Sequence, residues 1–222
     1  MIIHNTKIHT WRLASFGALL AGLTVTGCAP VFSDFQSARL LDRGKVEVTP
    51  SLSSVSFTDS GESGHVQYNG GLQVGAGISE FLEMRAGCYR VFDLGDEVGG
   101  VNVLGFGPKF SIVRDRVAFV VPVGFAFGAD IDQSETWAFH PTVLFTSSRG
   151  NFEITPSAKA LIPLSDDGGD TLFAFNLGAG IRPGESGVTL RPELGMLVNP
   201  GESGVFWSFG AGISYRFGGV RP

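Results

Sequence analysis

The amino-acid sequence predicts an all-β protein, folded as an antiparallel up-and-down transmembrane β-barrel of about ten strands. Three observations support this prediction. Segments of roughly 10–14 residues alternate large apolar with small or polar side chains from residue 45 to residue 217. Glycine (32 residues) and phenylalanine (19 residues) are abundant, whereas only 17% of the 222 residues are charged. Acidic residues also gather in every second connection between the alternating segments.

The alternating segments are the expected strands. Short clusters of Gly, Asp, Glu, Ser and Asn separate them, and no window shows a helical period. Repeated alternation at this spacing is typical of antiparallel β-structure. Each segment also exceeds the 9–11 residues, or thereabouts, that a tilted strand needs to cross a membrane. We place the strands at 45–58, 65–79, 81–94, 101–113, 117–129, 136–147, 152–164, 171–182, 188–199 and 205–217.

The two faces of each segment differ in a way that favours a barrel in lipid. In 65–79, one face carries Leu72 and Val74, and the other carries Gln73, Gly75 and Gly77. Glycine weakens a strand, so many glycines on one face require a reason. The crowded interior of a narrow barrel provides that reason, while the large apolar side chains face lipid. A soluble sandwich would instead usually place charged residues and Thr on its water-facing side.

The connections at the two ends of the predicted barrel differ in charge. The loops after odd-numbered segments carry twelve acidic residues and no Lys or Arg, and the turns at the opposite end carry four basic and three acidic residues. A membrane protein with two distinct faces explains this asymmetry, whereas a soluble sandwich does not. The acidic loops are 59–64, 93–100, 129–135, 165–170 and 199–204.

Ten charged residues fall on the face that we assign to the lumen. Buried charges are costly unless they are paired, so we expect these residues to pair with one another. We favour a salt-bridge plug that fills a narrow lumen over a gated polar pore or a ligand site. The predicted charge network comprises Lys45, Glu47, Glu83, Arg85, Lys109, Glu153, Lys159, Arg191, Glu193 and Arg216.

The N-terminal segment has the pattern of a bacterial export signal. Lys7 and Arg12 precede a short apolar stretch over 13–25. The stretch ends in Val-Thr-Gly-Cys-Ala at 25–29, which resembles the lipobox of bacterial lipoproteins. The resemblance implies cleavage before Cys28, its lipidation, and sorting away from the inner membrane because Ala and not Asp follows it. We therefore expect a signal peptide over 1–27, a lipidated periplasmic leader over 28–44, a barrel over 45–217 and a tail over 218–222.

The region after residue 44 resembles small bacterial outer-membrane β-barrels in its pattern. That resemblance implies an outer-membrane location with both termini in the periplasm, and a structural or narrow-channel role. It also implies contact with outer-membrane lipid, the barrel-assembly machinery and the lipoprotein-sorting machinery. The formal charge of −5 argues against a nucleic-acid partner.

Two alternatives to this assignment are a lipid-tethered soluble periplasmic β-domain and an envelope-modifying enzyme. The ten-stranded omptin proteases use Asp pairs with an Asp–His couple near the outer rim. Here neither His65 nor His140 lies in an Asp-x-His pattern, and Asp130 and Asp132 have no neighbouring His. We therefore expect no enzyme, no cofactor and no metal site, and we interpret Cys88 as a small hydrophobic residue.

The lipobox generates the first testable prediction. Replacing Cys28 with Ser removes the thiol that would carry the diacylglycerol, so Cys28→Ser should leave an unprocessed precursor that takes up no labelled palmitate. The measurement is palmitate incorporation and precursor size on a gel. A wild-type protein that takes up no palmitate contradicts the lipoprotein assignment.

Overall fold

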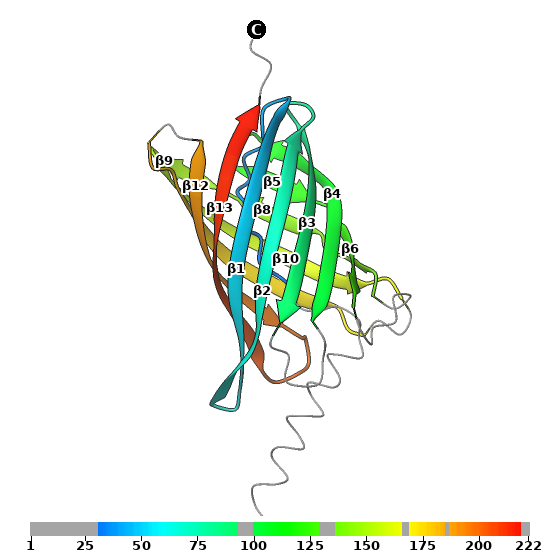
Figure 1. The fold of residues 1–222 in the computed structure, drawn as a ribbon. Helices are drawn as coiled ribbons and strands as arrows, with labels where there is room; N and C mark the ends of the chain where they lie inside the picture. Colours follow the sequence, from blue (N-terminus) through cyan, green and yellow to red (C-terminus); the bar gives the residue numbers. More distant parts are fainter. Residues whose placement is uncertain (1–30, 93–99, 129–135, 166–168, 185–186, 219–222) are drawn as a thin grey trace, which may run out of the picture.

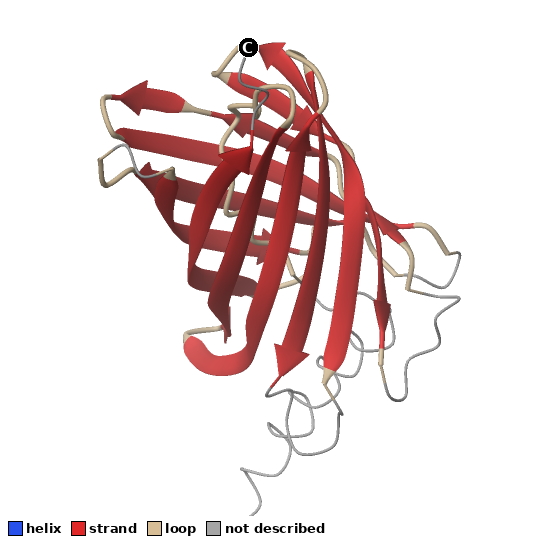
Figure 2. Ribbon diagram, turned by 45° about the horizontal axis from the view of Figure 1, so that its top comes forward, coloured by secondary structure: helices blue, strands red, loops and turns tan. Residues whose placement is uncertain are grey.

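The chain forms one closed barrel of ten antiparallel strands, two of which are interrupted (Figure 1; Figure 2). The computed structural model describes residues 31–92, 100–128, 136–165, 169–184 and 187–218. No helix in this part of the chain is long and apolar enough to cross a membrane. The described strand segments are β1 (Lys45–Asp59), β2 (Glu62–Gly77), β3 (Leu82–Phe92), β4 (Val101–Val113), β5 (Val117–Val120), β6 (Val123–Phe127), β7 (Ala138–Phe139), β8 (Thr142–Phe145), β9 (Ser147–Arg149), β10 (Phe152–Pro163), β11 (Leu172–Ile181), β12 (Val188–Val198) and β13 (Val205–Gly218).

Pairing between the first and last strands closes the barrel. Ser53 of β1 pairs with Asn69 of β2 on one side and with Gly210 of β13 on the other. Each remaining strand pairs with its neighbours in the chain, and β4 and β10 flank the interrupted strands. The predicted fold class is confirmed, and the strand positions agree closely with those expected. The second strand begins earlier than predicted, at Glu62 rather than at residue 65.

Proline explains the two interrupted strands. The fifth expected strand is divided into β5 and β6 next to Pro122, and the sixth is divided into β7, β8 and β9, with Pro141 in the first gap. Proline has no N–H to donate to a neighbouring strand. Backbone bonds still cross the gaps, because Val121 N donates to Pro108 O (2.9 Å) and His140 N donates to Pro122 O (2.9 Å). The wall therefore remains continuous.

The two faces of the wall are as the sequence predicts. On β2, Leu72 is 46% exposed, whereas its neighbour Gln73 is 6% exposed. On β13, Phe209 is 68% exposed and Ser208 is 2% exposed. Large apolar side chains thus cover the outside, and polar side chains are buried inside the barrel.

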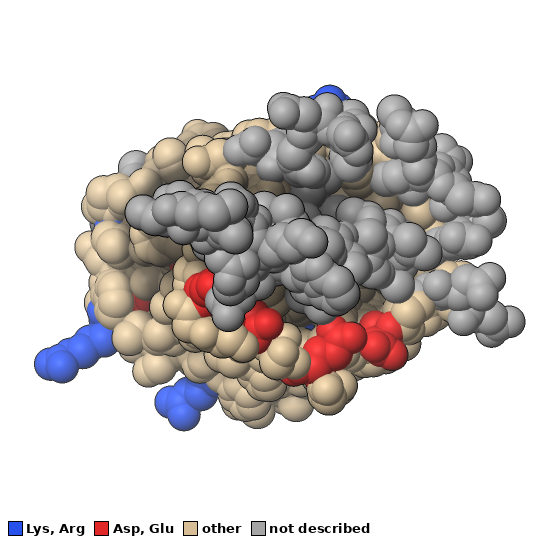
Figure 3. Space-filling model, turned by 90° about the horizontal axis from the view of Figure 1, so that it is seen from below, with Lys and Arg blue, Asp and Glu red and all other residues tan. Residues whose placement is uncertain are grey.

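The two ends of the barrel differ in their connections. We call one the loop end, where 60–61, 93–100, 128–137, 164–171 and 199–204 join the strands, and the other the turn end, with 78–81, 114–116, 150–151 and 182–187. Figure 3 views the loop end and shows acidic side chains along part of its rim. The described acidic residues in or directly beside these connections are Asp59, Glu62, Asp170 and Glu202. Residues 93–99 of the predicted acidic loop 93–100, the whole predicted loop 129–135, and residues 166–168 lie outside the described residues.

The structure describes residues 31–44 of the predicted leader, and from here on we call these residues the leader. They run through the inside of the barrel. Val31 packs with Val91 and Val101 near the loop end. At the other end of the leader, Gly44 N donates to Gly77 O (2.9 Å). We expected the segment over 28–44 in the periplasm. That expectation is corrected for its described part, which lies inside the barrel with Val31 near the loop end, whereas β13 ends at the turn end (Figure 1). Both ends of the chain, 1–30 and 219–222, lie outside the described residues.

The glycines of the inner face leave the space that the leader occupies. A Cβ on Gly195 would lie 3.0 Å from the Phe32 ring, and one on Gly210 would lie 2.8 Å from the Phe35 ring. A Cβ on Gly77 would lie 2.2 Å from the backbone oxygen of Asp42. The interior is crowded, as the sequence predicted, and much of the crowding comes from the leader.

The contact between Gly77 and the leader yields a prediction on stability. Gly77→Ala places a methyl group against the Asp42 carbonyl, and overpacking of this kind costs about 1–3 kcal/mol. Gly64→Ala on the same strand is the matched control, because no atom lies within 4 Å of its added Cβ. The measurement is the folding yield in lipid vesicles together with the urea midpoint. Equal values for the two variants would show that the leader does not lie against β2.

Candidate functional site

The charged residues inside the barrel form the candidate site, and strand alternation directs them inward. Register places several of them next to opposite charges, since Glu47 pairs across strands with Arg216 and Glu83 pairs with Lys109. We call the larger group the Glu47 network. It contains Glu47, Glu83, Arg85, Lys109, Glu153, Arg182, Arg191 and Arg216.

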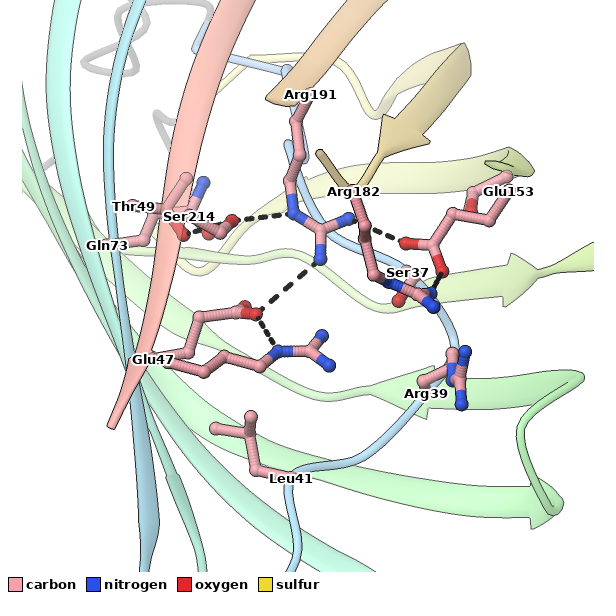
Figure 4. Close-up of polar contacts among 12 residues, drawn as sticks. Ser37, Arg39, Leu41, Glu47, Thr49, Gln73, Glu153, Arg182, Arg191 and Ser214 are labelled. Carbon is pink, nitrogen blue, oxygen red and sulfur yellow. Dashed lines mark hydrogen bonds and ion pairs between the residues drawn. The ribbon is translucent and has the colours of Figure 1, made fainter. Parts of the chain in front are cut away.

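Glu47 is the centre of this network. Its carboxylate oxygens lie 2.7 Å from Arg85 Nη2, 2.7 Å from Arg216 Nε and 3.5 Å from Arg191 Nη2. Figure 4 shows Arg191 lying between Glu47 and Glu153. Glu47 is buried, so its charge depends on these three guanidinium groups for compensation.

Two further carboxylates extend the network around the lumen. Glu83 accepts from Arg85 Nε (2.5 Å) and from the backbone N of Leu41 in the leader (2.9 Å). Glu153 accepts from Arg191 Nη1 (3.1 Å) and also from Arg182, a residue that follows β11. The network therefore links the strands to one another and to the leader.

The leader also compensates the excess of positive charge in the Glu47 network, where five cations face three carboxylates. Lys109 is fully buried, and its Nζ lies 3.9 Å from Glu83. The same Nζ donates to the backbone oxygens of Ser37 (2.6 Å) and Arg39 (3.0 Å). Carbonyl oxygens of the leader thus accept the hydrogen bonds of Lys109, whereas Arg182 Nε and Arg191 Nη2 are buried without a hydrogen-bond partner.

A second polar group, which we call the Asp34 site, holds the leader nearer to the loop end. Asp34 lies 2.8 Å from Lys159 Nζ and accepts hydrogen bonds from Ser157 (2.5 Å) and Asn176 (2.8 Å). Glu193 accepts from the backbone N–H groups of Asp34 (2.7 Å) and Phe35 (2.8 Å). The predicted residues Lys159 and Glu193 therefore bind the leader rather than joining the Glu47 network.

Lys45 is the one predicted network residue that lies away from both groups, within the described part of the chain. Its Nζ pairs with Asp42 (2.5 Å) at the turn end, where Asp42 is exposed and Lys45 is partly exposed. The hydrogen bond from Lys45 lowers the pKa of the Asp42 carboxyl. Asp42 and Lys45 thus hold the point at which the leader turns into β1.

Apolar side chains fill the lumen between the Asp34 site and the loop end. Phe32 of the leader packs with Val55, Leu161 and Leu197 of the wall. All four side chains are almost fully buried. The leader therefore fills the barrel with an apolar layer toward the loop end and a charged layer toward the turn end.

A cavity of about 100 Å³ remains between the leader and the wall. Asp34, Gln36, Tyr89, His140 and Lys159 are among the residues that line it. The Oε1 atom of Gln36 and the Nε2 atom of His140 are buried without a hydrogen-bond partner. The lining is mostly apolar, but these two atoms offer polar partners, and the volume is large enough for ordered water.

The two histidines do not assemble into a catalytic arrangement in the described part of the chain. His140 lies inside the barrel near Lys159 and the cavity, whereas His65 lies on β2 with its ring 4.3 Å from that of Tyr68. No group of three or more His, Cys, Asp or Glu residues among those described could hold a metal ion. Cys28, Asp130 and Asp132 lie outside the described residues, and Cys88 is an exposed free thiol.

Sequence reasoning missed the leader as part of the site. Phe32, Phe35 and Leu41 are apolar, but their spacing shows no strand or helix period. Arg182 was also missed: it ends the strand predicted at 171–182, and in the structure it directly follows β11, which ends at Ile181. The one signal for the leader was the excess of inward glycine, which leaves room for a further segment of chain.

No protein-family model matches the chain, and no curated protein matches it. Among solved structures, it is similar to Ail, the attachment invasion locus protein of Yersinia pestis, with 13% identity and a TM-score of 0.39 over 79% of this chain and 99% of that one. It is also similar to the translocator domain of the autotransporter NalP from Neisseria meningitidis, with 12% identity and a TM-score of 0.45 over 96% and 100% of the two chains. A third similar structure is Neisserial surface protein A, with 11% identity and a TM-score of 0.36 over 79% and 100%.

The Glu47 network predicts a large loss of stability when its central charge is removed. Glu47→Gln leaves three buried or partly buried arginines without their shared carboxylate, and breaking a buried pair costs about 3–5 kcal/mol. Glu80→Gln is the control, because Glu80 is exposed and lies 3.8 Å from the exposed Arg114. Such a surface change stays within about 0.5 kcal/mol. Urea unfolding of both variants in vesicles provides the comparison, and a small effect at Glu47 would refute the central role of its charge.

Proposed function

We propose that this protein is an outer-membrane β-barrel lipoprotein whose lumen is closed by its own leader, with a structural role in the cell envelope. The observation that carries the proposal is the course of residues 31–44 through the barrel. The membrane location, the closed lumen and the lipid anchor each have separate support.

The outer surface of the barrel supports a location in a membrane. Its strands expose large apolar side chains such as Phe106, Leu177 and Phe209. The polar side chains point inward, which is the reverse of a soluble protein with an apolar core. The first and last strands, β1 and β13, also pair with each other, and such closure is what a lipid environment requires of β-structure.

The contacts of the leader support a closed lumen. Its carbonyl oxygens at Phe32, Asp34 and Ser37 accept hydrogen bonds from Lys159, Gln73 and Lys109 of the wall. Its backbone N–H groups are bound by the carboxylates of Glu83 and Glu193. Displacing the leader would remove these hydrogen bonds and break the buried ion pair between Lys159 and Asp34, and breaking such a pair costs about 3–5 kcal/mol.

The lipid anchor rests on the sequence around Cys28. Acylation there would bind the protein to outer-membrane lipid in addition to the barrel itself. The implied partners are outer-membrane lipid, the lipoprotein-sorting machinery and the barrel-assembly machinery. We expect no enzymatic activity.

A gated channel is the alternative function, and the polar wall favours it. If the leader moved, Arg85, Lys109 and Glu83 would line a polar passage. The side-chain oxygens of Ser33 in the leader and Ser208 on β13 lie 3.1 Å apart, so cysteines at both positions could form a disulfide that holds the leader in place.

Conductance measurements separate the two functions. In planar bilayers, we expect no regular conductance steps from the folded full-length protein, because the leader fills the lumen. In a Cys88→Ser background, Ser33→Cys/Ser208→Cys should form the disulfide and also remain silent, whereas Ser33→Cys/Ser148→Cys should form none, because Ser148 lies near the turn end. Conductance steps that occur in the wild type but are absent from the oxidised Ser33→Cys/Ser208→Cys variant would establish the gated channel instead. Failure of the first pair to cross-link would contradict the position of the leader.

A further inference from the structure

We infer that the cavity between the leader and the wall binds one small neutral molecule, which has an apolar body and a single hydroxyl or amide group. This inference goes beyond the proposed function, because a barrel closed by its own leader needs no ligand. Three features lead to it: an inner glycine that packing does not require, a lining whose charges are paired, and two neutral polar atoms without partners.

Glycines on adjacent strands form part of the cavity wall. Gly87 on β3 pairs with Gly105 on β4, and both line the cavity. A Cβ on Gly87 would lie 3.1 Å from the Tyr89 ring, so that position is crowded. A Cβ on Gly105 would have only the backbone oxygen of Val123 within 4 Å, at 3.9 Å. No close contact in the described part of the chain therefore requires glycine at 105, and the missing side chain keeps the cavity open.

The charged groups of the lining have partners, so a ligand need not carry a charge. Asp34 and Lys159 form an ion pair of 2.8 Å. Arg85 donates to Glu83 (2.5 Å) and to Glu47 (2.7 Å). A charged ligand would lose its hydration in a place where the described charges already compensate one another, and burial of an unpaired charge is costly. The lining therefore favours a neutral molecule.

Two neutral polar atoms of the described lining residues are buried without a hydrogen-bond partner, Oε1 of Gln36 and Nε2 of His140. The backbone on both sides of the His140 ring is held in place. His140 N donates to Pro122 O (2.9 Å), and Pro141 O accepts from Ala160 N (3.1 Å). A buried polar atom that lacks a partner destabilises the fold. Each of the two atoms therefore favours a bound group that can form a hydrogen bond with it.

Apolar groups make up most of the lining, and they favour an organic molecule over water. They include Val31, Val103 and Val120. An ordered water needs two to four polar partners, or thereabouts, so several waters would compete for few groups. A molecule with an apolar body can contact the valines and use its one polar group for Gln36 or His140. The cavity measures about 100 Å³, and because a dry cavity of roughly 150 Å³ accommodates benzene, the ligand is smaller than benzene.

The imidazole of His140 provides a direct readout of binding. The full-length protein, with nitrogen-15 in its histidines and folded in detergent micelles, is titrated at constant pH with 2-propanol. We expect a saturable change in the His140 Nε2 resonance, which is identified by its loss in His140→Gln. We expect no change at His65, which is exposed on β2. Acetate and 2-propylammonium have the same branched shape but carry a charge, and we expect neither to bind.

Filling the cavity provides the matched variants. Gly105→Val projects a side chain into the cavity, and it should weaken the binding of 2-propanol at least tenfold. Gly64→Val on β2 is the control, because its added Cβ meets no atom within 4 Å and Gly64 does not line the cavity. Binding to this control should equal that of the wild type. If Gly105→Val does not fold, Gly105→Ala takes its place with a single added methyl group.

Three results overturn the inference. Absence of a saturable change at His140 in the folded wild type shows that the cavity holds water only. Equal binding to the wild type and to Gly105→Val places the alcohol elsewhere on the protein. Binding of acetate or 2-propylammonium as tight as that of 2-propanol contradicts a neutral ligand. None of these results bears on the membrane location or the closed lumen, which the conductance measurements test separately.

Discussion

The compensation of buried charge inside the barrel is the constraint on which the rest of the structure depends. Lys109 and Glu83 are fully buried, and both bind backbone groups of the leader as well as each other's side chains. Without the leader, these donors and acceptors would lose part of their hydrogen bonding in a place where water competes poorly. The buried polar groups of the wall and those of the leader therefore depend on each other for part of their hydrogen bonding.

The same constraint explains why the inner face combines glycines with long charged side chains. Glycine at 195, 210 and 212 leaves room for Phe32 and Phe35, whereas Glu193 on β12 reaches the backbone of the leader. Neighbouring positions on β12 and β13 thus have two roles: the glycines leave space for the leader, and Glu193 accepts hydrogen bonds from its backbone. A barrel built in this way has little open volume, since the cavity beside Gln36 and His140 measures about 100 Å³.

A threaded leader has consequences for assembly as well as for transport. Pairing of β1 with β13 closes the wall, and the leader directly precedes β1 in the chain. Its buried contacts with Asn176 and Ser208 require it to reach the lumen, either before the wall closes or through one of the two ends.

The sequence by itself determined the fold class, the strand positions and the two faces, because a period of two along each strand is a local property. Leu72 outward and Gln73 inward follow directly from that period. Parity also indicated an inner position for charged residues such as Glu47 and Glu83, but it included Lys45, which lies at the turn end, and it omitted Arg182. Only the tertiary structure decided how they divide: Glu47 gathers three arginines, whereas Lys159 and Glu193 hold the leader. The position of the leader was likewise undecidable from the sequence, because an aperiodic segment acquires its place only from long-range contacts such as those of Asp34 with β10, β11 and β12.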